Sequence, residues 1–225
     1  MKLLIVIHIE TKEQALEQST IAFENGVDGI FLISHSKPYS FVLNTLRYIR
    51  ETFPMQWIGI NCLDLEPIEL LYLLDSTING IWADNAHINE FKHVQDYATE
   101  FITYRSLNVW KGLYFGGVAF KYQQPVTDLV NVVNLAVNYM DVVTTSGPGT
   151  GHAPTIKKIN TMCDTIDGKG KLAIASGITP DNVHLYSRVD YVLVATGIST
   201  DFHHLDSSKV QQLVKNIKLI NQGKL

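Results

Sequence analysis

The strongest constraint on the fold is an alternation that recurs eight times along the chain. Each unit joins an apolar run of strand length to a segment whose apolar residues recur at helical spacing. The runs are continuously apolar, which is typical of strands buried on both faces of a parallel sheet. The runs are Leu3–His8, Gly29–Ser34, Trp57–Asn61, Gly80–Ala83, Gly112–Ala119, Asp141–Thr145, Leu172–Ser176 and Tyr191–Thr196.

A helical pattern follows each of these runs. The expected helical segments are Leu16–Val27, Phe41–Glu51, Ile68–Leu74, Phe91–Ile102, Leu129–Ala136, a segment from Pro154, a short one at Pro180–Ser187, and Val210–Ile220. Eight strand–helix units predict a (β/α)8 TIM barrel, with an open doubly wound sheet as the alternative. No linker or shift in composition divides the chain, so we expect residues 1–225 to form a single domain.

Composition restricts the partners. The chain has 225 residues, 46% of them hydrophobic, and a net charge of -4. A chain of this size and composition can bury a large core. Its net negative charge gives no basic surface of the kind that binds nucleic acid. Cys62 and Cys163 form no C-x-x-C pair, which suits a reducing, cytoplasmic setting. The opening "MKLLIVIHIE" is too short an apolar run for a signal peptide, and we expect no membrane partner. The sequence leaves open whether the chain forms a homo-oligomer.

A repeated loop points to function. "AIASGITPD" (Ala173–Asp181) returns as "LVATGISTD" (Leu193–Asp201), and the glycine-rich "TTSGPGTGHAP" (Thr144–Pro154) lies one unit earlier. All three follow predicted strand ends, and the loops after strands seven and eight of barrels often bind phosphate. Small hydroxyls can donate to phosphate oxygens, glycines allow close approach, and helix N-termini supply N–H groups. The structural alternative is a set of tight turns with hydroxyl caps.

We therefore predict an anion site built from these three loops. It is neither a P-loop, because no Lys-Ser or Lys-Thr follows, nor G-x-G-x-x-G, because His152 and Ala153 follow Gly151. We expect no cofactor. The predicted phosphate-binding residues are Thr145, Ser146, Gly147, Gly149, Gly151, Ser176, Gly177, Ile178, Thr196, Gly197, Ile198 and Ser199.

Other polar residues at strand ends are candidates for catalysis, because barrel chemistry sits at the carboxyl ends of strands. His8 and Asp84 are candidate acids or bases, Lys121 could neutralise a phosphate or an oxyanion, and Asn61 is a hydrogen-bond donor. A buried structural histidine, a helix cap and a solvated lysine are the alternatives. Ser34 and His35 end the second strand.

The segment "DFHHLD" (Asp201–Asp206) is the candidate for metal binding. Adjacent histidines point to different sides in most backbone conformations, and no H-E-x-x-H or two-histidine, one-carboxylate spacing accompanies them. We therefore expect no metal site, and interpret Asp206 as the cap of the last helix.

The loop motifs also carry a resemblance. "ASGI" followed by "ATGIS" resembles the closing loops of ribulose-phosphate-binding barrels. "GVDGIFLIS", "IGIN", "VVTTSGPGTGHAP" and "VLVATGISTDFHHLDSSKVQQLV" are similar to the BtpA-like barrel family. That family includes a photosystem assembly factor, and related chains sometimes carry a phosphoribosyltransferase label. The chain departs from the phosphoribosyltransferase signature, an acidic pair followed by T-G-x-T, because Asp141 stands alone before its strand.

These observations predict a protein that binds a phosphorylated small molecule, either a sugar phosphate or a phosphoribosyl compound. The polar strand ends favour acid–base isomerase or lyase chemistry. Phosphoribosyl transfer or hydrolysis is an alternative, as is a non-catalytic ligand-binding or assembly-factor barrel. An enzyme requires its acid and base within reach of one ligand, whereas a binding protein requires only the anion site.

Overall fold

A computed structural model describes residues 1–225 of the chain. Eight parallel strands, each paired with its sequence neighbours, close into a barrel because β8 also pairs with β1. The strands are β1 (Lys2–His8), β2 (Gly29–Ile33), β3 (Ile58–Asn61), β4 (Gly80–Ala83), β5 (Leu113–Gly117), β6 (Val142–Thr145), β7 (Lys171–Ile174) and β8 (Tyr191–Val194). The predicted (β/α)8 fold is confirmed, and the open sheet is excluded.

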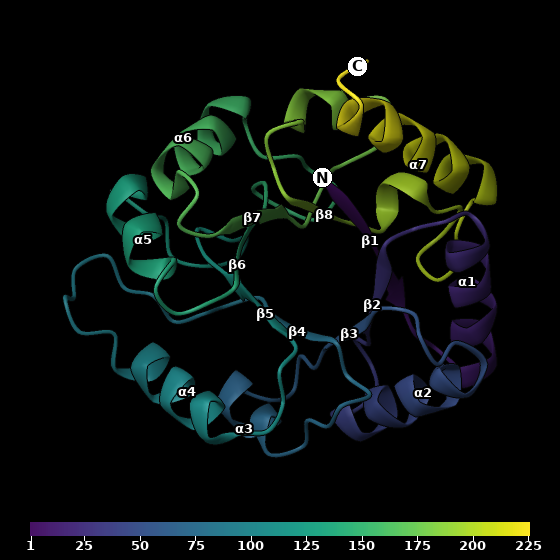
Figure 1. Cartoon of the computed structure of the whole chain (residues 1–225), viewed down its shortest axis with the longest axis horizontal. Coiled ribbons are helices and arrows are strands. Elements are labelled where there is room, and N and C mark those ends of the chain that lie inside the picture. The colour runs from purple at the N-terminus through teal and green to yellow at the C-terminus, as the bar shows by residue number, and fades with distance from the viewer.

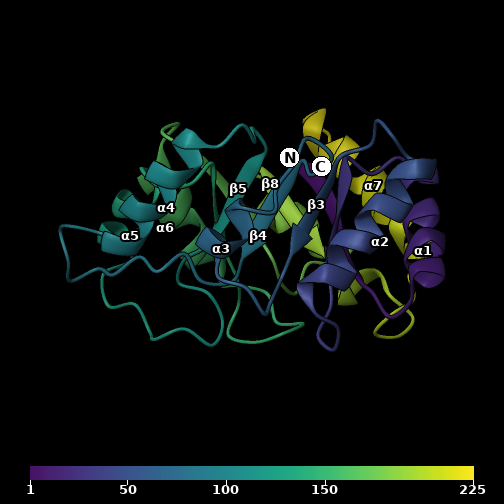
Figure 2. The same cartoon turned by 90° about the horizontal axis from the view of Figure 1, so that it is seen from below.

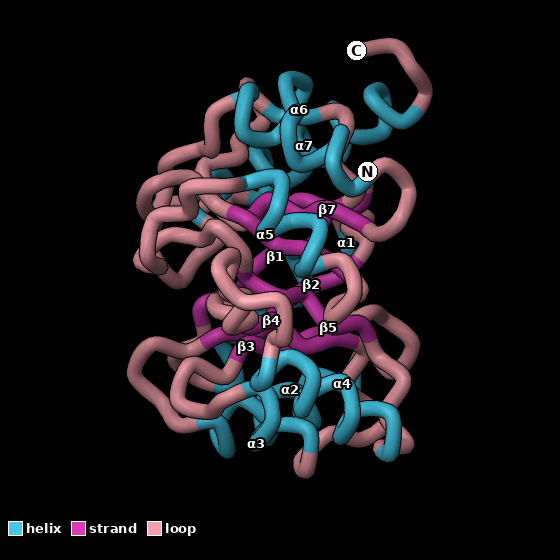
Figure 3. Tube along the Cα trace, turned by 90° about the vertical axis from the view of Figure 1, so that its left-hand side faces the viewer, coloured by secondary structure: helices cyan, strands magenta, loops and turns pink.

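Helices surround the strands (Figure 1), and in Figure 3 they lie on both sides of the magenta strands. The α-helices are α1 (Lys12–Glu24), α2 (Tyr39–Thr52), α3 (Pro67–Leu71), α4 (Asp96–Leu107), α5 (Leu129–Ala136), α6 (Ile156–Ile166) and α7 (Ser207–Asn221). Two 3-10 helices, η1 (Val183–Tyr186) and η2 (Thr196–Ile198), follow β7 and β8. Asp206 caps α7 by accepting from the N–H groups of Ser208 and Lys209, as predicted.

Two helical expectations were wrong in detail. After β7 the chain forms only the 3-10 turn η1, so seven rather than eight α-helices cover the barrel. Phe91 and Val94 were placed on a helix, but α4 begins at Asp96. The buried Gln95 side chain bonds both backbone groups of Asn89, which closes the preceding segment into a loop and leaves Phe91 and Val94 exposed.

Large aromatic side chains fill the barrel interior. The Phe115 ring lies 5.2 Å from that of Phe31 and 5.1 Å from that of Tyr191. The Trp57 ring packs against Phe31 and against the backbone of Gly80. A Cβ at Gly80 would lie 2.5 Å from that ring, so the indole fits only because this strand position has no side chain. The interior is therefore a packed core, and any ligand must bind at an end of the barrel.

The two ends of the barrel differ. Both termini lie at the amino end of the strands, where the Met1 ammonium donates to Asn221 Oδ1 over 2.8 Å. The longer connections hang from the carboxyl end, at the lower edge of Figure 2. No helix combines the length and the apolar character needed to cross a membrane.

Candidate functional site

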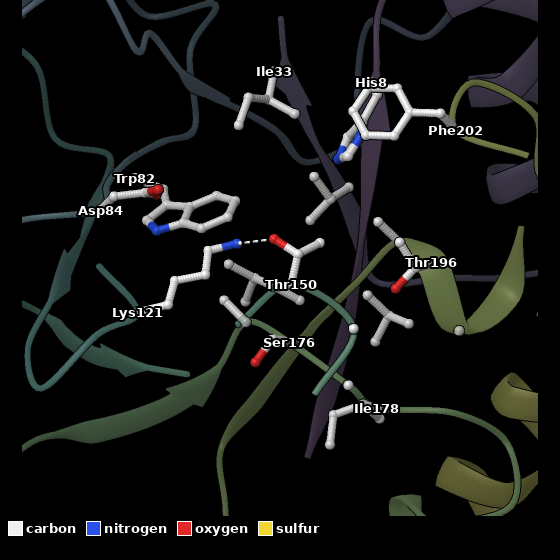
Figure 4. A pocket seen from close by; sticks show the side chains of 18 of the residues that line it. His8, Ile33, Trp82, Asp84, Lys121, Thr150, Ser176, Ile178, Thr196 and Phe202 are labelled. Carbon is white, nitrogen blue, oxygen red and sulfur yellow. Dashed lines mark hydrogen bonds between the residues drawn. The ribbon is translucent and has the colours of Figure 1, made fainter. Parts of the chain in front are cut away.

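A cavity lies at the carboxyl ends of the strands (Figure 4), with a volume of about 110 Å³. Residues from β1, β2, β4 and β8 and from the loops after β4 to β8 meet there. The lining includes His8, Ile33, His35, Trp82, Asp84, Lys121, Thr150, Gly151, Ser176, Gly177, Ile178, Thr196, Gly197 and Phe202. Three of the four predicted catalytic residues and six of the predicted phosphate-binding residues thus share one cavity.

The three predicted anion loops contact one another through glycines. A Cβ at Gly177, in the loop after β7, would lie 2.0 Å from the Ala153 nitrogen in the loop after β6. Within the loop after β6, a Cβ at Gly147 would lie 2.0 Å from the His152 carbonyl oxygen. A Cβ at Gly197 would lie 2.0 Å from the Ile178 carbonyl oxygen. Only glycine permits such backbone contacts. The repeated glycines therefore bring the loops after β6, β7 and β8 together.

Where these loops meet, three residues that line the cavity have backbone N–H groups without a partner in the chain. The N–H groups of Gly151, Gly177 and Ile178 donate to no other group of the chain, and all three residues line the cavity. Gly177 has φ +68°, a left-handed conformation that favours glycine. The exposed Thr196 adds a hydroxyl. Several unpaired donors around one space form the kind of site that binds an anion.

Other predicted phosphate-binding residues have structural contacts. Ser176 Oγ accepts from the Gly147 N–H and donates to the His152 carbonyl, each over 2.8 Å, which links two loops. Thr145 Oγ1 donates to the Ala119 carbonyl, and Ser146 Oγ accepts from the Lys121 N–H. Six of the predicted phosphate-binding residues do not line the cavity: Thr145, Ser146, Gly147, Gly149, Ile198 and Ser199. A direct role for them in phosphate binding stays a prediction.

Asp84 follows β4 and carries the half-buried carboxylate of the site. Asn61, at the end of β3, donates from Nδ2 to Asp84 Oδ1 over 3.0 Å. Burial raises the pKa of Asp84, while the Asn61 hydrogen bond and the charge of Lys121 oppose the rise. Asn61 itself lines a neighbouring cavity of about 180 Å³ rather than this one. Its position is that of a residue that orients Asp84.

His8 ends β1 in an aromatic environment. Its ring lies 4.1 Å from that of Phe202 and 5.2 Å from that of His35. Burial, together with the nearby His35 and His203, lowers the pKa of His8 to about 4. The buried Nδ1 has no hydrogen-bond partner. His8 is therefore a neutral imidazole at pH 7 whose Nδ1 has no partner in the chain.

Two lysines approach the site from different sides. Lys121 lines the cavity, and its Nζ donates to Thr150 Oγ1 over 3.3 Å (Figure 4). Lys158, near the start of α6, donates from Nζ to the carbonyls of Ala119 and Ser146 over 2.6 and 2.8 Å. Burial lowers the pKa of Lys158 to about 8. Lys158 thus ties together the segments that follow β5 and β6.

Sequence reasoning missed several lining residues, among them Trp82, Thr150 and Phe202. Trp82 belongs to the apolar run of β4, and its buried Nε1 has no partner. Phe202 lies within the segment that was considered for metal binding. There His203 Nδ1 donates to the His8 carbonyl and His204 Nδ1 contacts Asp201, so the two histidines point apart. No cluster of three metal-ligating side chains exists.

No protein-family model matches the chain, and no curated protein matches it in sequence. The resemblance to the BtpA-like family therefore stays a prediction. Many solved structures share the fold. The native KDPGal structure is similar with a TM-score of 0.70 and 13% identity, over 99% of this chain and 97% of that chain.

Two enzymes named for phosphorylated sugar compounds are also similar. The 3-hexulose-6-phosphate synthase from Salmonella typhimurium has a TM-score of 0.69 and 18% identity, over 98% of this chain and 100% of that chain. The phosphoribosyl anthranilate isomerase from Thermus thermophilus has a TM-score of 0.67 and 16% identity, over 97% and 98%. The fold and these similarities define the class: the chain is a (β/α)8 TIM barrel.

Proposed function

We propose that the protein binds a phosphorylated small molecule at the carboxyl end of the barrel and acts on it by proton transfer, as an isomerase or lyase. The observation that carries this proposal is the composition of one cavity. Gly177 and Ile178, whose N–H groups are unpaired, line it together with the half-buried carboxylate of Asp84. The similarity to barrels named for phosphorylated sugar compounds supports the same reading.

The phosphate rests on the loops after β6, β7 and β8. The N–H groups of Gly151, Gly177 and Ile178 and the hydroxyl of Thr196 donate to its oxygens. Lys121 contributes a positive charge that attracts the anionic ligand, and its ammonium, whose one hydrogen bond is to the Thr150 hydroxyl over 3.3 Å, can turn toward the substrate. The site requires no reorganisation of the loops, since glycine contacts already hold them together.

The sugar portion lies toward Asp84, which removes a proton from a carbon next to a carbonyl group. The electron pair moves onto the carbonyl oxygen, where Lys121 stabilises the negative charge. The proton of the adjacent hydroxyl group moves to that oxygen, and return of the first proton to the former carbonyl carbon completes the isomerisation of an aldose and a ketose. Burial raises the pKa of Asp84 toward neutrality, which suits a group that both accepts and returns a proton. Neutral His8 exchanges hydrogen bonds with a substrate hydroxyl.

Calorimetry with ribose 5-phosphate and ribose tests the binding step. The parent protein should bind ribose 5-phosphate and should not bind ribose. Thr196→Asp places a carboxylate at the anion site on an exposed residue. At ~4 Å, like charges repel by ~1 kcal/mol in water and ~4 kcal/mol near a protein surface, so affinity should fall roughly tenfold or more. Thr52→Asp, at the exposed end of α2, is the matched control and should bind as the parent does.

Deuterium exchange tests the chemistry. In D2O, a proton-transfer enzyme introduces deuterium beside the carbonyl of a ketose phosphate such as ribulose 5-phosphate, which NMR detects. The parent should catalyse this exchange and Asp84→Asn should not. Binding of ketose and aldose phosphates without exchange would instead favour the non-catalytic ligand-binding barrel.

A further inference from the structure

A third and larger cavity borders Asp84 and Lys121. It is a groove of about 720 Å³ between the segment after β4 and the segment after β5. Residues 84–91 form one wall and residues 119–126 form the other. Asp84 and Lys121 line both this groove and the cavity over the anion loops. The two groups proposed to perform the chemistry therefore stand between two spaces.

The groove walls carry aromatic rings and amides. Phe91 is 79% exposed and Tyr122 is 82% exposed, although both line the groove. Asn85, Asn89 and Gln124 add amide groups. Exposed aromatic faces with hydrogen-bonding groups beside them are suited to planar heterocyclic rings, which stack on the former and bond to the latter.

The groove is held in a defined shape. His87, Ala119 and Tyr122 have φ values of 55°, 49° and 65°, and they are three of the four non-glycine residues with positive φ. Such conformations persist only where the surroundings enforce them, and they cluster at binding sites. Gln123 supplies part of that constraint, because its Nε2 donates to the Asp84 carbonyl over 2.8 Å and bridges the two walls.

The size of the first cavity also points to a second space. The first cavity, at about 110 Å³, is much smaller than the groove, at about 720 Å³. A further group on the same molecule would have to pass Asp84 and Lys121, and the groove is the space that it would enter.

We propose that this groove is a second subsite, which binds a planar heterocyclic ring attached to the sugar phosphate. This inference rests on the proposed function, and it narrows the ligand to a ring-bearing sugar phosphate. The phosphate occupies the anion loops, the sugar lies beside Asp84 and Lys121, and the ring stacks on Phe91 and Tyr122.

Three probes separate the two subsites in calorimetric and NMR titrations. Ribose 5-phosphate reports the anion loops alone, adenosine reports the groove alone, and AMP reports both. We expect AMP to bind roughly tenfold more tightly than ribose 5-phosphate, the size of a typical base–aromatic stacking contribution. In a Phe91→Ala/Tyr122→Ala double variant this advantage should disappear, while the affinity for ribose 5-phosphate stays unchanged.

Tyr72→Ala is the matched control, because Tyr72 is 70% exposed and lies outside the groove. It should retain the full advantage of AMP. The groove proposal is overturned if AMP and ribose 5-phosphate bind the parent equally, or if the double variant retains the advantage of AMP. Failure of both phosphorylated probes to bind would overturn the proposed function instead. Adenosine binding that the double variant loses would then still support the groove.

Discussion

Asn61 holds the carboxylate of Asp84 across the ends of two adjacent strands, with 3.0 Å between Nδ2 and Oδ1. Asn61 is 2% exposed, so its amide is fixed by packing before any ligand arrives. Burial raises the pKa of Asp84, and this hydrogen bond limits the rise. The pair therefore keeps a half-buried carboxylate oriented, as the proposed proton transfer requires, at the expense of stability.

Asp84→Asn should stabilise the fold. An acid whose pKa is raised by folding contributes stability below its unfolded pKa, and loses that contribution as pH rises through the folded value. At pH 7 the ionised carboxylate is thus unfavourable, and a neutral amide of the same shape should raise the free energy of unfolding by about 1 kcal/mol. Urea unfolding measures the change. The exposed Asp181→Asn should show none, and a destabilised Asp84→Asn would contradict the account.

His8 should make stability fall in mild acid. Its pKa drops from 6.5 to about 4 on folding, so the unfolded chain binds a proton between these values and the native chain does not. Stability present above pH 6.5 is therefore lost as pH falls toward 4, by about 2 kcal/mol between pH 7 and pH 5. His8→Asn should lose this part of the pH dependence, and exposed His184→Asn should keep it. Equal slopes for both variants in urea unfolding would refute the assignment.

Two glycines allow backbone conformation to be separated from loop packing. Gly168 and Gly177 have φ values of +76° and +68°, but a Cβ would meet nothing within 4 Å at Gly168 and the Ala153 nitrogen at 2.0 Å at Gly177. In both alanine variants the new residue must adopt the left-handed conformation, which lowers the free energy of unfolding by roughly 1–2 kcal/mol. Gly177→Ala should cost at least about 2 kcal/mol more, in the range of overpacked sites. Similar unfolding free energies for the two variants would mean that the loops are not packed through this glycine.

The sequence was sufficient for the barrel and for part of the site. Continuous apolar runs predicted all eight strands, and the meeting of parallel strand ends predicted that His8, Asp84 and Lys121 would share a cavity. The repeated loop predicted that Gly177 and Gly197 would converge, since close backbone contact requires glycine. In each of these cases a local sequence pattern has a single physical cause: continuous apolar runs are required by buried strands, and glycine is required by close backbone contact.

Other features depend on contacts between distant residues. Phe202 covers His8 because His203 bonds the His8 carbonyl, a contact between residues 195 positions apart. In the sequence, Trp82 is one apolar residue of a strand, and only the closed barrel shows that it lines the cavity. Thr145 and Ser146 were predicted as phosphate ligands, but their hydroxyls contact Ala119 and Lys121 across the loops. No local pattern distinguishes these partners.

Lys158 should prove to be a positioning residue for the anion site. Its Nζ is the hydrogen-bond donor that joins the Ala119 and Ser146 carbonyls, and it lies outside the cavity lining. Lys158→Met removes both bonds and leaves buried carbonyls without this partner, so the free energy of unfolding should fall by about 2 kcal/mol. The loops that carry Lys121 and Gly151 should also separate, and affinity for ribose 5-phosphate should drop roughly tenfold in calorimetry, equivalent to about 1.4 kcal/mol. Lys157→Met changes the net charge equally at an exposed neighbour and should alter neither quantity. A Lys158→Met protein that is as stable as the parent and binds as tightly would show that the loops are held by their glycine contacts alone.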